Sequence, residues 1–592
     1  MSIDVRITKA KDGNEILEVA KDGQTYRLNS TYKPFAEAEK FAKPYADLEE
    51  NSILLVFGFG NGIFADALMK ACGTTTKVIF YEPCEAVMEC IKECLDVSSF
   101  CDSRNCELVA DGIVSKEEGH IHTIAQFPLV LNKYVHYYKR KKIHSCILPK
   151  YKELFPEQYD RYWNTIEFHI QMLQTNRQTA EALGHIMVEN NINMLKYLPE
   201  SYCADSFVSL FPENMPAILV SAGPSLEKNI KELQKAKGRA FIVCVDTAVK
   251  YMLREDIFPD VIVTIDPRKE LSLFDDERIR EIPLVGVTDM SCKVLEKTRS
   301  RKLILAYTQN PYIQELYTKA GHQLMEFACG GSVATTAYSL CHDLGFKRLI
   351  LVGQDLALTG NQMYAGREKL SMDTFNRELI EVEDVYGEII YTTRDYYYYL
   401  KWFEQRVELY SEMQVIDATE GGAKINGTLV MSLQEALTEY AKEEYDIRAI
   451  IESVEPVFKQ EDREDLIQRF LHDRQSYNYL VKKLQEGVSL AKKGVKMASA
   501  VGQPGEQEYK KLNKQMMKIC DMYDASHINF LVQREIDAAD LENYLKLCEE
   551  ELSVTRREQY EIMQQYFECV LRAAKSVKAV YDELKFEDYV VD

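Results

Sequence analysis

The feature that most constrains this chain is an apolar strand pattern that passes through a Gly-Pro-Ser turn into a helical pattern. Residues 218–220 are typical of a buried strand, and helical spacing follows the turn in Leu226, Ile230 and Leu233. We therefore expect Ser225 near a helix N-terminus, where free N–H groups attract an anion. Gly223 lets a ligand approach the backbone, Pro224 stiffens the turn, and the Ser225 hydroxyl caps the helix or contacts a phosphate. The turn is either a phosphate cradle or a plain strand–turn–helix junction.

The same alternation of strand and helix patterns continues from about residue 205 to 440, which predicts an α/β domain with a doubly wound, Rossmann-like parallel sheet. The expected strands are 217–220, 241–245, 261–265, 284–287, 303–306, 323–328 and 348–352. Ligands of such sheets bind outside the carboxyl ends of the strands. The residues that follow the strands are therefore the candidates: Ser221–Ser225, Asp246, Thr247, Asp266, Pro267, Thr288, Asp289, Gly330, Gly331, Ser332, Gly353, Gln354 and Asp355.

Each of these candidates has a chemical and a structural interpretation. Asp246 and Asp266 are able to accept ribose hydroxyls or base donors, or to cap the helices that follow them. Gly330–Ser332 opens another helix, which offers N–H groups and hydroxyls to a diphosphate or a sugar carboxylate, or simply packs closely on the sheet. Asp355 is placed to orient an acceptor or to act as a base.

The first 200 residues contain a second strand–glycine loop–helix unit. Gly58, Gly60 and Gly62 follow the strand pattern 53–57, and Glu82 ends the next strand. Glycines at this spacing with an acid about 20 residues later are typical of nucleoside binding, and the loop resembles that of methyltransferases that use S-adenosylmethionine. The alternative is a Rossmann-like module that is structural and holds no ligand.

Composition limits the class of partner. The 592-residue chain has a formal net charge of −21, which argues against nucleic acid or an anionic membrane as the main partner. No CxxC pair or interleaved His accompanies the cysteines between Cys72 and Cys106, so no metal site is expected. No signal segment or membrane-spanning run is present, which predicts a soluble cytoplasmic protein.

Three domains are expected: residues 1–200, 205–440 and 441–592. From Glu506 onward the chain has neither glycine nor proline, and apolar residues recur at helical intervals, which predicts an all-helical C-terminal domain. That domain is either a plain helical bundle or a docking surface for a partner protein.

Several motifs in a fixed order resemble the motility accessory factor (Maf) family of flagellin glycosyltransferases. They are Val220–Leu226, Val261–Pro267, Gly330–Thr336, Leu351–Ala357 and Asp417–Gly427. The resemblance is strongest over residues 205–440, and the flanking regions fit the three-part layout of the family. It implies a central domain similar to bacterial sialyltransferases, which need no metal or other cofactor.

The activity that this resemblance implies is transfer of a nonulosonic acid, of the pseudaminic or legionaminic kind, from a CMP-activated donor to Ser or Thr of flagellin, in support of flagellum assembly and motility. It further implies that Gly223, Pro224 and Ser225 contact CMP and that Asp246 and Asp266 face the nucleoside. Gly330–Ser332 would hold the carboxylate or phosphate of the donor.

One position departs from the family. Tyr364 stands about where related chains carry a His, so the base is open among Asp355, Tyr364 and Glu420. Two other functions stay open: an ATP-dependent enzyme that resembles 6-hydroxymethyl-dihydropterin diphosphokinases, and a non-catalytic flagellin-binding factor. The sequence predicts neither the particular nonulosonic acid nor the oligomeric state.

Overall fold

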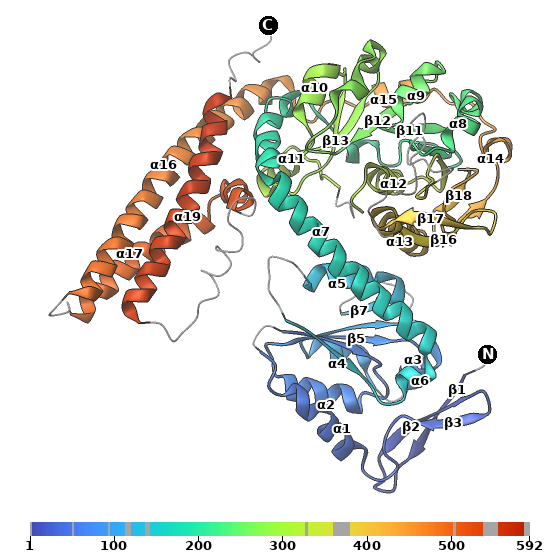
Figure 1. Cartoon of the computed structure of the whole chain (residues 1–592), viewed down its shortest axis with the longest axis vertical. Helices are drawn as coiled ribbons and strands as arrows, with labels where there is room; N and C mark the ends of the chain where they lie inside the picture. Colours follow the sequence, from blue (N-terminus) through green and yellow to red (C-terminus); the bar gives the residue numbers. More distant parts are fainter. Residues whose placement is uncertain are drawn as a thin grey trace. The chain divides into compact units, whose positions relative to one another are not determined.

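The computed structural model describes residues 3–49, 52–92, 95–112, 120–135, 142–325, 330–358, 379–500, 505–536 and 555–584. The chain forms two compact units, Met1–Gln178 and Thr179–Asp592. Helix α7 (Pro156–Met194) carries the chain from one unit to the next (Figure 1). No described helix combines the length and the apolar character needed to cross a membrane.

The first unit contains a small antiparallel sheet and a larger parallel one. The antiparallel strands are β1 (Asp4–Lys9), β2 (Glu15–Lys21) and β3 (Gln24–Arg27). The parallel sheet has the order β7-β6-β5-β4-β8 and consists of β4 (Ile53–Phe57), β5 (Lys77–Glu82), β6 (Cys106–Ala110), β7 (Ile121–Thr123) and β8 (Ile143–Ile147). Its helices are α1 (Pro34–Ala42), α2 (Ile63–Cys72), α3 (Glu85–Lys92), α4 (Val97–Asp102), α5 (Phe127–Tyr134) and α6 (Tyr151–Leu154).

The second unit is built on a nine-stranded, wholly parallel sheet of order β19-β18-β15-β10-β11-β12-β13-β14-β9. Its strands are β9 (Tyr202–Cys203), β10 (Ala217–Val220), β11 (Phe241–Val245), β12 (Val261–Thr264), β13 (Leu284–Val287), β14 (Leu303–Tyr307), β15 (Arg348–Val352), β18 (Gln414–Asp417) and β19 (Leu429–Val430). The predicted doubly wound fold is confirmed. Such strands are buried on both faces, which explains their continuous Val, Ile and Leu content.

The helices of this domain are α8 (Leu226–Asn229), α9 (Val249–Arg254), α10 (Cys292–Thr298), α11 (Pro311–Lys319), α12 (Val333–Asp343), α13 (Arg394–Leu409), α14 (Leu433–Tyr440) and α15 (Ile447–Glu452). The hairpin β16 (Leu379–Glu383) and β17 (Ile389–Thr393) precedes α13. One predicted strand is wrong in its described part, because Gln323–Met325 is irregular. There Met325 N–H donates to Ala306 of β14 as a single loop contact.

The order of the strands determines where a ligand is able to bind. From β10 the chain adds β11 to β14 on one side, and it then returns to place β15 on the other side. The carboxyl ends of β10 and β15 therefore border the crevice where the winding direction reverses, which is the usual ligand position in such sheets.

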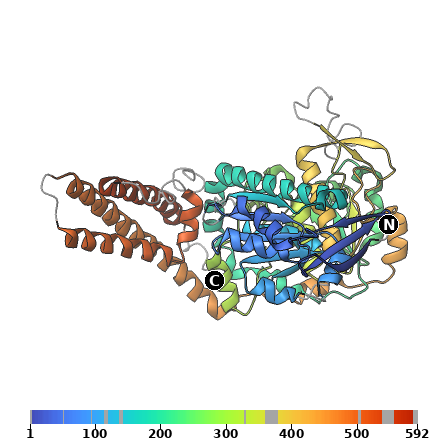
Figure 2. The ribbon, with the colours of Figure 1, turned by 90° about the horizontal axis from the view of Figure 1, so that it is seen from below.

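The C-terminal region consists of helices, as predicted, with α16 (Gln460–Ser499), α17 (Glu506–Asp524) and α19 (Arg556–Glu583) side by side in both views (Figures 1 and 2). Two glycines allow α16 to approach α19. A Cβ on Gly487 would lie 2.7 Å from the Phe567 ring, and one on Gly494 would overlap the Tyr560 ring. Rings of α19 thus fill the space that side chains on α16 would occupy.

Candidate functional site

A pocket lies at the carboxyl ends of β10 and β15, where the winding of the sheet reverses. It brings together eleven of the residues predicted from the sequence: Ser221, Ala222, Gly223, Asp246, Thr247, Asp266, Gly331, Ser332, Gly353, Gln354 and Asp355. Val245, Lys269, Val333, Ala334, Leu356, Tyr396 and Tyr399 complete the lining. Residues from five separate segments thus converge on one hollow, as the strand-end pattern predicts.

Asp355 holds the Gly-Pro-Ser turn in place. Its Oδ1 accepts a hydrogen bond of 2.5 Å from Ser225 Oγ, and the Ser225 N–H lies 3.2 Å from both carboxylate oxygens. Ser225 is fully buried, and helix α8 after it has only four residues. The expectation that Ser225 offers its N–H and hydroxyl to a phosphate is therefore corrected, because both groups already bind Asp355.

The two glycines beside this carboxylate are required by close packing. Gly223 N–H donates to Gly353 O at 2.8 Å, and a Cβ on Gly223 would overlap Asp355 Oδ1. Gly353 has a φ of +68°, and a Cβ there would overlap the Ser221 carbonyl oxygen. Gly223 lines the pocket, but the space beside it is occupied by the chain's own carboxylate.

Lys269 joins the two strand-end aspartates. Its Nζ lies 2.8 Å from Asp246 Oδ1 and 2.5 Å from Asp266 Oδ2. Asp246 is completely buried, and among the described residues none donates a hydrogen bond to its Oδ2. Burial raises the pKa of Asp246 above its usual value, although Lys269 acts against this. Burial would lower the pKa of Lys269, but its two carboxylate partners keep it above the ordinary value.

Helix α12 presents its N-terminus to the pocket. Ser332 is the N-cap, and its Oγ accepts from Thr335 N–H in a capping box. The N–H groups of Gly330 and Ser332 donate to Thr335 Oγ1. The N–H groups of Gly330 and Ser332 are therefore already paired, while Val333 and Ala334 occupy the first two helical positions and line the pocket together with Gly331 and Ser332.

Two tyrosines form an aromatic side of the pocket. Tyr396 and Tyr399, three residues apart on α13, share one helical face and line the hollow. Tyr399 donates a hydrogen bond of 3.2 Å to the Gly331 carbonyl oxygen. Trp402, one turn further, covers Gly330, where a Cβ would lie 2.6 Å from the indole ring.

Several other predicted residues lie away from the pocket lining, among them Pro224 and Gly330. The Pro267 carbonyl accepts from Asn190 Nδ2 at 2.9 Å. Glu420 Oε1 accepts from Asn229 Nδ2 and from Leu433 N–H at the start of α14, so it holds that helix outside the pocket lining, and its role as a base stays a prediction. Tyr364 lies outside the described residues.

Side chains from other parts of the first unit pack against its glycine loop. Glu82 is completely buried and accepts hydrogen bonds from Phe59 N–H, Gly60 N–H and the Tyr151 hydroxyl, at 2.9, 3.1 and 2.6 Å. A Cβ on Gly58 would lie 2.8 Å from the Tyr151 ring. The loop amides and Tyr151 thus already pair with the Glu82 carboxylate, which favours the structural interpretation of this loop.

Lys269 is the functional residue that the sequence analysis missed. It comes two residues after Pro267, at the end of a predicted strand, and it is the one cation among the residues that line the pocket. The available signal was a cation close to the strand-end Asp266-Pro267 pair. The burial of its partner Asp246 became visible only in the folded chain.

Comparison with known proteins shows which proteins share the fold of this chain. The sequence model of the family described as "6-hydroxymethylpterin diphosphokinase MptE-like" matches residues 189–361. The solved structure of the Maf glycosyltransferase from Magnetospirillum magneticum AMB-1 is similar over 99% of this chain and 94% of that one, with a TM-score of 0.52 and 15% identity. The chain has the Maf glycosyltransferase fold. The predicted resemblance to the Maf family is thus confirmed at the level of the fold. No curated protein sequence matches the chain.

Proposed function

We propose that this chain is a glycosyltransferase that moves a nonulosonic acid of the pseudaminic or legionaminic kind from CMP to Ser or Thr hydroxyls of flagellin. The observation that carries the proposal is the pocket at the sheet's reversal point within a chain that has the Maf fold along its length. Such a donor carries a phosphate and a carboxylate, so its binding requires positive groups near both. Lys269 and the N-terminus of α12 supply them.

In the proposed complex the nucleoside lies over β11 and β12. Asp246 lines the pocket and its buried Oδ2 accepts nothing from the described residues, so it suits a ribose hydroxyl. Lys269 lies between Asp246 and Asp266 and is near enough to balance added negative charge. The N–H groups of Val333 and Ala334 suit the phosphate or the sugar carboxylate, with a charge-assisted hydrogen bond contributing about 1.5–3 kcal/mol.

In the transfer step, the acceptor hydroxyl oxygen forms a bond to the anomeric carbon while the bond from that carbon to the CMP phosphate oxygen breaks. The hydroxyl proton passes to a base, and CMP leaves with the bonding electrons. Asp355 is the described candidate base that lines the pocket, and Tyr364 stays a second candidate. Tyr396 and Tyr399 are placed to contact the sugar or the acceptor peptide.

A thermal-shift titration tests the donor. A ligand that binds only the folded chain at 100 times its Kd stabilises it by about 2.7 kcal/mol. We expect CMP to raise the melting temperature without added metal in wild type and in Glu420→Gln, which alters a residue outside the pocket, and to raise it much less in Lys269→Met. A response to ATP–Mg²⁺ alone would instead support a diphosphokinase-like enzyme.

A transfer assay tests the acceptor. Purified chain, CMP-activated nonulosonic acid and flagellin should give flagellin with an added mass at Ser or Thr, measured by mass spectrometry. Asp355→Asn should abolish transfer with CMP binding kept if Asp355 is the base. Flagellin that binds the chain but stays unmodified would instead indicate a non-catalytic binding factor.

A further inference from the structure

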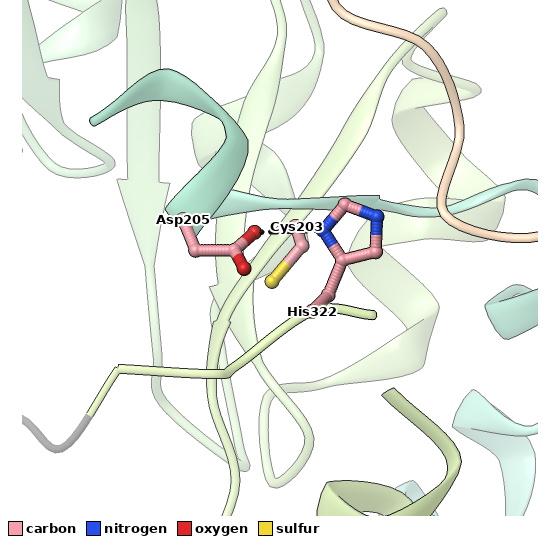
Figure 3. Close-up of side chains that lie close together, drawn as sticks. All are labelled: Cys203, Asp205 and His322. Atoms are coloured by element: carbon pink, nitrogen blue, oxygen red, sulfur yellow. Dashed lines mark hydrogen bonds and ion pairs between the residues drawn. The ribbon is translucent and has the colours of Figure 1, made fainter. Parts of the chain in front are cut away.

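A second cluster of chemically distinctive side chains lies at the far edge of the central sheet. Cys203 ends the edge strand β9, Asp205 lies in the short 3-10 helix Ala204–Phe207, and His322 follows α11 (Figure 3). One ligand atom from each residue lies within 4.8 Å of those of the other two. Cys203 is buried, while the Asp205 and His322 side chains each retain 25% exposure, so solvent reaches one side of the cluster.

The backbone fixes these three side chains before any ligand is present. Cys203 pairs with Leu305 of β14 in the parallel sheet. The Asp205 carboxylate accepts Gln323 N–H at Oδ2, 2.8 Å away, and its Oδ1 lies 3.0 Å from His322 Nδ1. In Figure 3 the Asp205 carboxylate faces the His322 ring nitrogen, and the Cys203 thiol lies beside them. Hydrogen bonds thus orient the carboxylate from outside the cluster.

We propose that Cys203, Asp205 and His322 bind a Zn²⁺ ion, with water as the fourth ligand. A thiolate, an imidazole and a carboxylate are the three ligand types that Zn²⁺ takes in proteins, at about 2.3, 2.0–2.1 and 2.0–2.2 Å. A thiolate is a poor ligand for Mg²⁺ or Ca²⁺, which excludes the hard cations. The three ligand atoms lie close enough together for one ion to contact all of them.

Binding exchanges a proton for the metal. The Cys203 thiol releases its proton to water and the sulfur binds Zn²⁺, while His322 binds through its unprotonated Nδ1. Zinc affinity is therefore expected to rise with pH, because fewer protons compete for the sulfur.

The ion would join two segments that lead to different parts of the domain. Cys203 and Asp205 belong to the start of the sheet edge, and His322 belongs to the connection between α11 and the Gly330–Ser332 turn of the pocket. Met325 N–H, three residues after His322, donates to Ala306 of β14 at 2.9 Å. Zinc would thus stabilise the edge of the sheet and the described segment 322–325 that follows α11.

Metal analysis of the purified full chain tests this site. After zinc loading and dialysis, wild type should retain about one Zn²⁺ per chain by mass spectrometry of the metal, and Co²⁺ should give a thiolate-to-cobalt charge-transfer band. Cys203→Ser and His322→Gln should each lower the retained zinc at least tenfold and remove the band. Circular dichroism checks that each variant is folded.

Cys292→Ser is the matched control, because Cys292 is also buried in this domain but its Sγ donates to the Asn190 carbonyl, a bond that serine keeps. This variant should retain zinc like wild type. Wild type that loses its zinc on dialysis, or equal zinc in all four proteins, would overturn the proposal. In that case the three residues form only the hydrogen-bonded group seen here.

Discussion

Lys269 is a single side chain on which the electrostatics of the pocket depend. It is the one cation among the residues that line the pocket, and it forms an ion pair with the buried Asp246. Lys269→Met should raise the KM for the CMP donor roughly 10- to 100-fold, since a charge-assisted hydrogen bond contributes about 1.5–3 kcal/mol. Steady-state kinetics measure this. Lys297→Met, which breaks an exposed pair with Asp275 remote from the pocket, should leave the KM unchanged.

Gly223 is a second single residue on which the pocket depends, because it packs closely against Asp355 and Gly353. Gly223→Ala would push a Cβ into Asp355 Oδ1 and the Gly353 carbonyl, so the turn must shift. We expect a loss of about 1–3 kcal/mol in unfolding free energy, as for overpacking, together with loss of CMP binding. Chemical denaturation and thermal shift measure the two effects. Gly505→Ala is the control, because a Cβ there meets nothing within 4 Å; an equal effect in both variants would contradict this account.

At the scale of elements, the β4–β5 pair of the first unit depends on the buried Glu82. Burial raises the pKa of Glu82 from 4.5 to about 7, while hydrogen bonds from Tyr151, Phe59, Gly60 and Cys84 act against this shift. The pKa of Glu82 is higher in the folded chain than in the unfolded chain. The contribution of protonated Glu82 to the free energy of unfolding is therefore complete below pH 4.5 and is lost as pH rises through about 7. The difference corresponds to about 3 kcal/mol.

Tyr151→Phe tests this assignment, because it keeps the ring over Gly58 and removes one donor to Glu82. The pKa of Glu82 should then rise further, and amides of β4 and β5 should exchange faster above pH 7 than in wild type, by hydrogen exchange with mass spectrometry. At pH 5 the two proteins should differ less. Tyr45→Phe, a partly buried tyrosine of the same unit, is the control; an equal pH response there would contradict the assignment.

Element by element, the sequence predicted the central sheet well because its strands are continuous apolar runs. The strands that it missed, β9, β18 and β19, have two to four residues and no such run. Gln323–Met325 was misassigned because an apolar pattern alone does not distinguish a strand from a packed loop.

At the scale of the whole molecule, the segment after residue 440 supports the central sheet. Lys302, a buried side chain beside β14, donates from Nζ to the carbonyls of Ile451 and Val454 at 2.7 and 3.2 Å. Val457 N–H donates to Ser201 O at 2.9 Å. The domain boundary predicted at residue 440 stays a prediction, and truncation tests it.

A chain that ends at residue 440 should fold poorly, because an unpaired buried ammonium costs about 3 kcal/mol or more. A chain that ends at 459 keeps the acceptors of Lys302 and should still be stabilised by CMP. Expression, thermal unfolding and CMP titration of the two truncations measure this. Equal folding of both would show that residues 447–458 are dispensable for the sheet.

The sequence by itself determined the type of fold and the strand ends at which the pocket lies, because hydrophobic periodicity and glycine turns are local properties. Only the tertiary structure decided which polar groups were already paired. Ser225 binds Asp355, Glu420 holds α14, and Tyr151 fills the first glycine loop. These pairings join residues far apart in the chain. The same long-range packing left Asp246 Oδ2 without a hydrogen-bond donor among the described residues and gathered Cys203, Asp205 and His322.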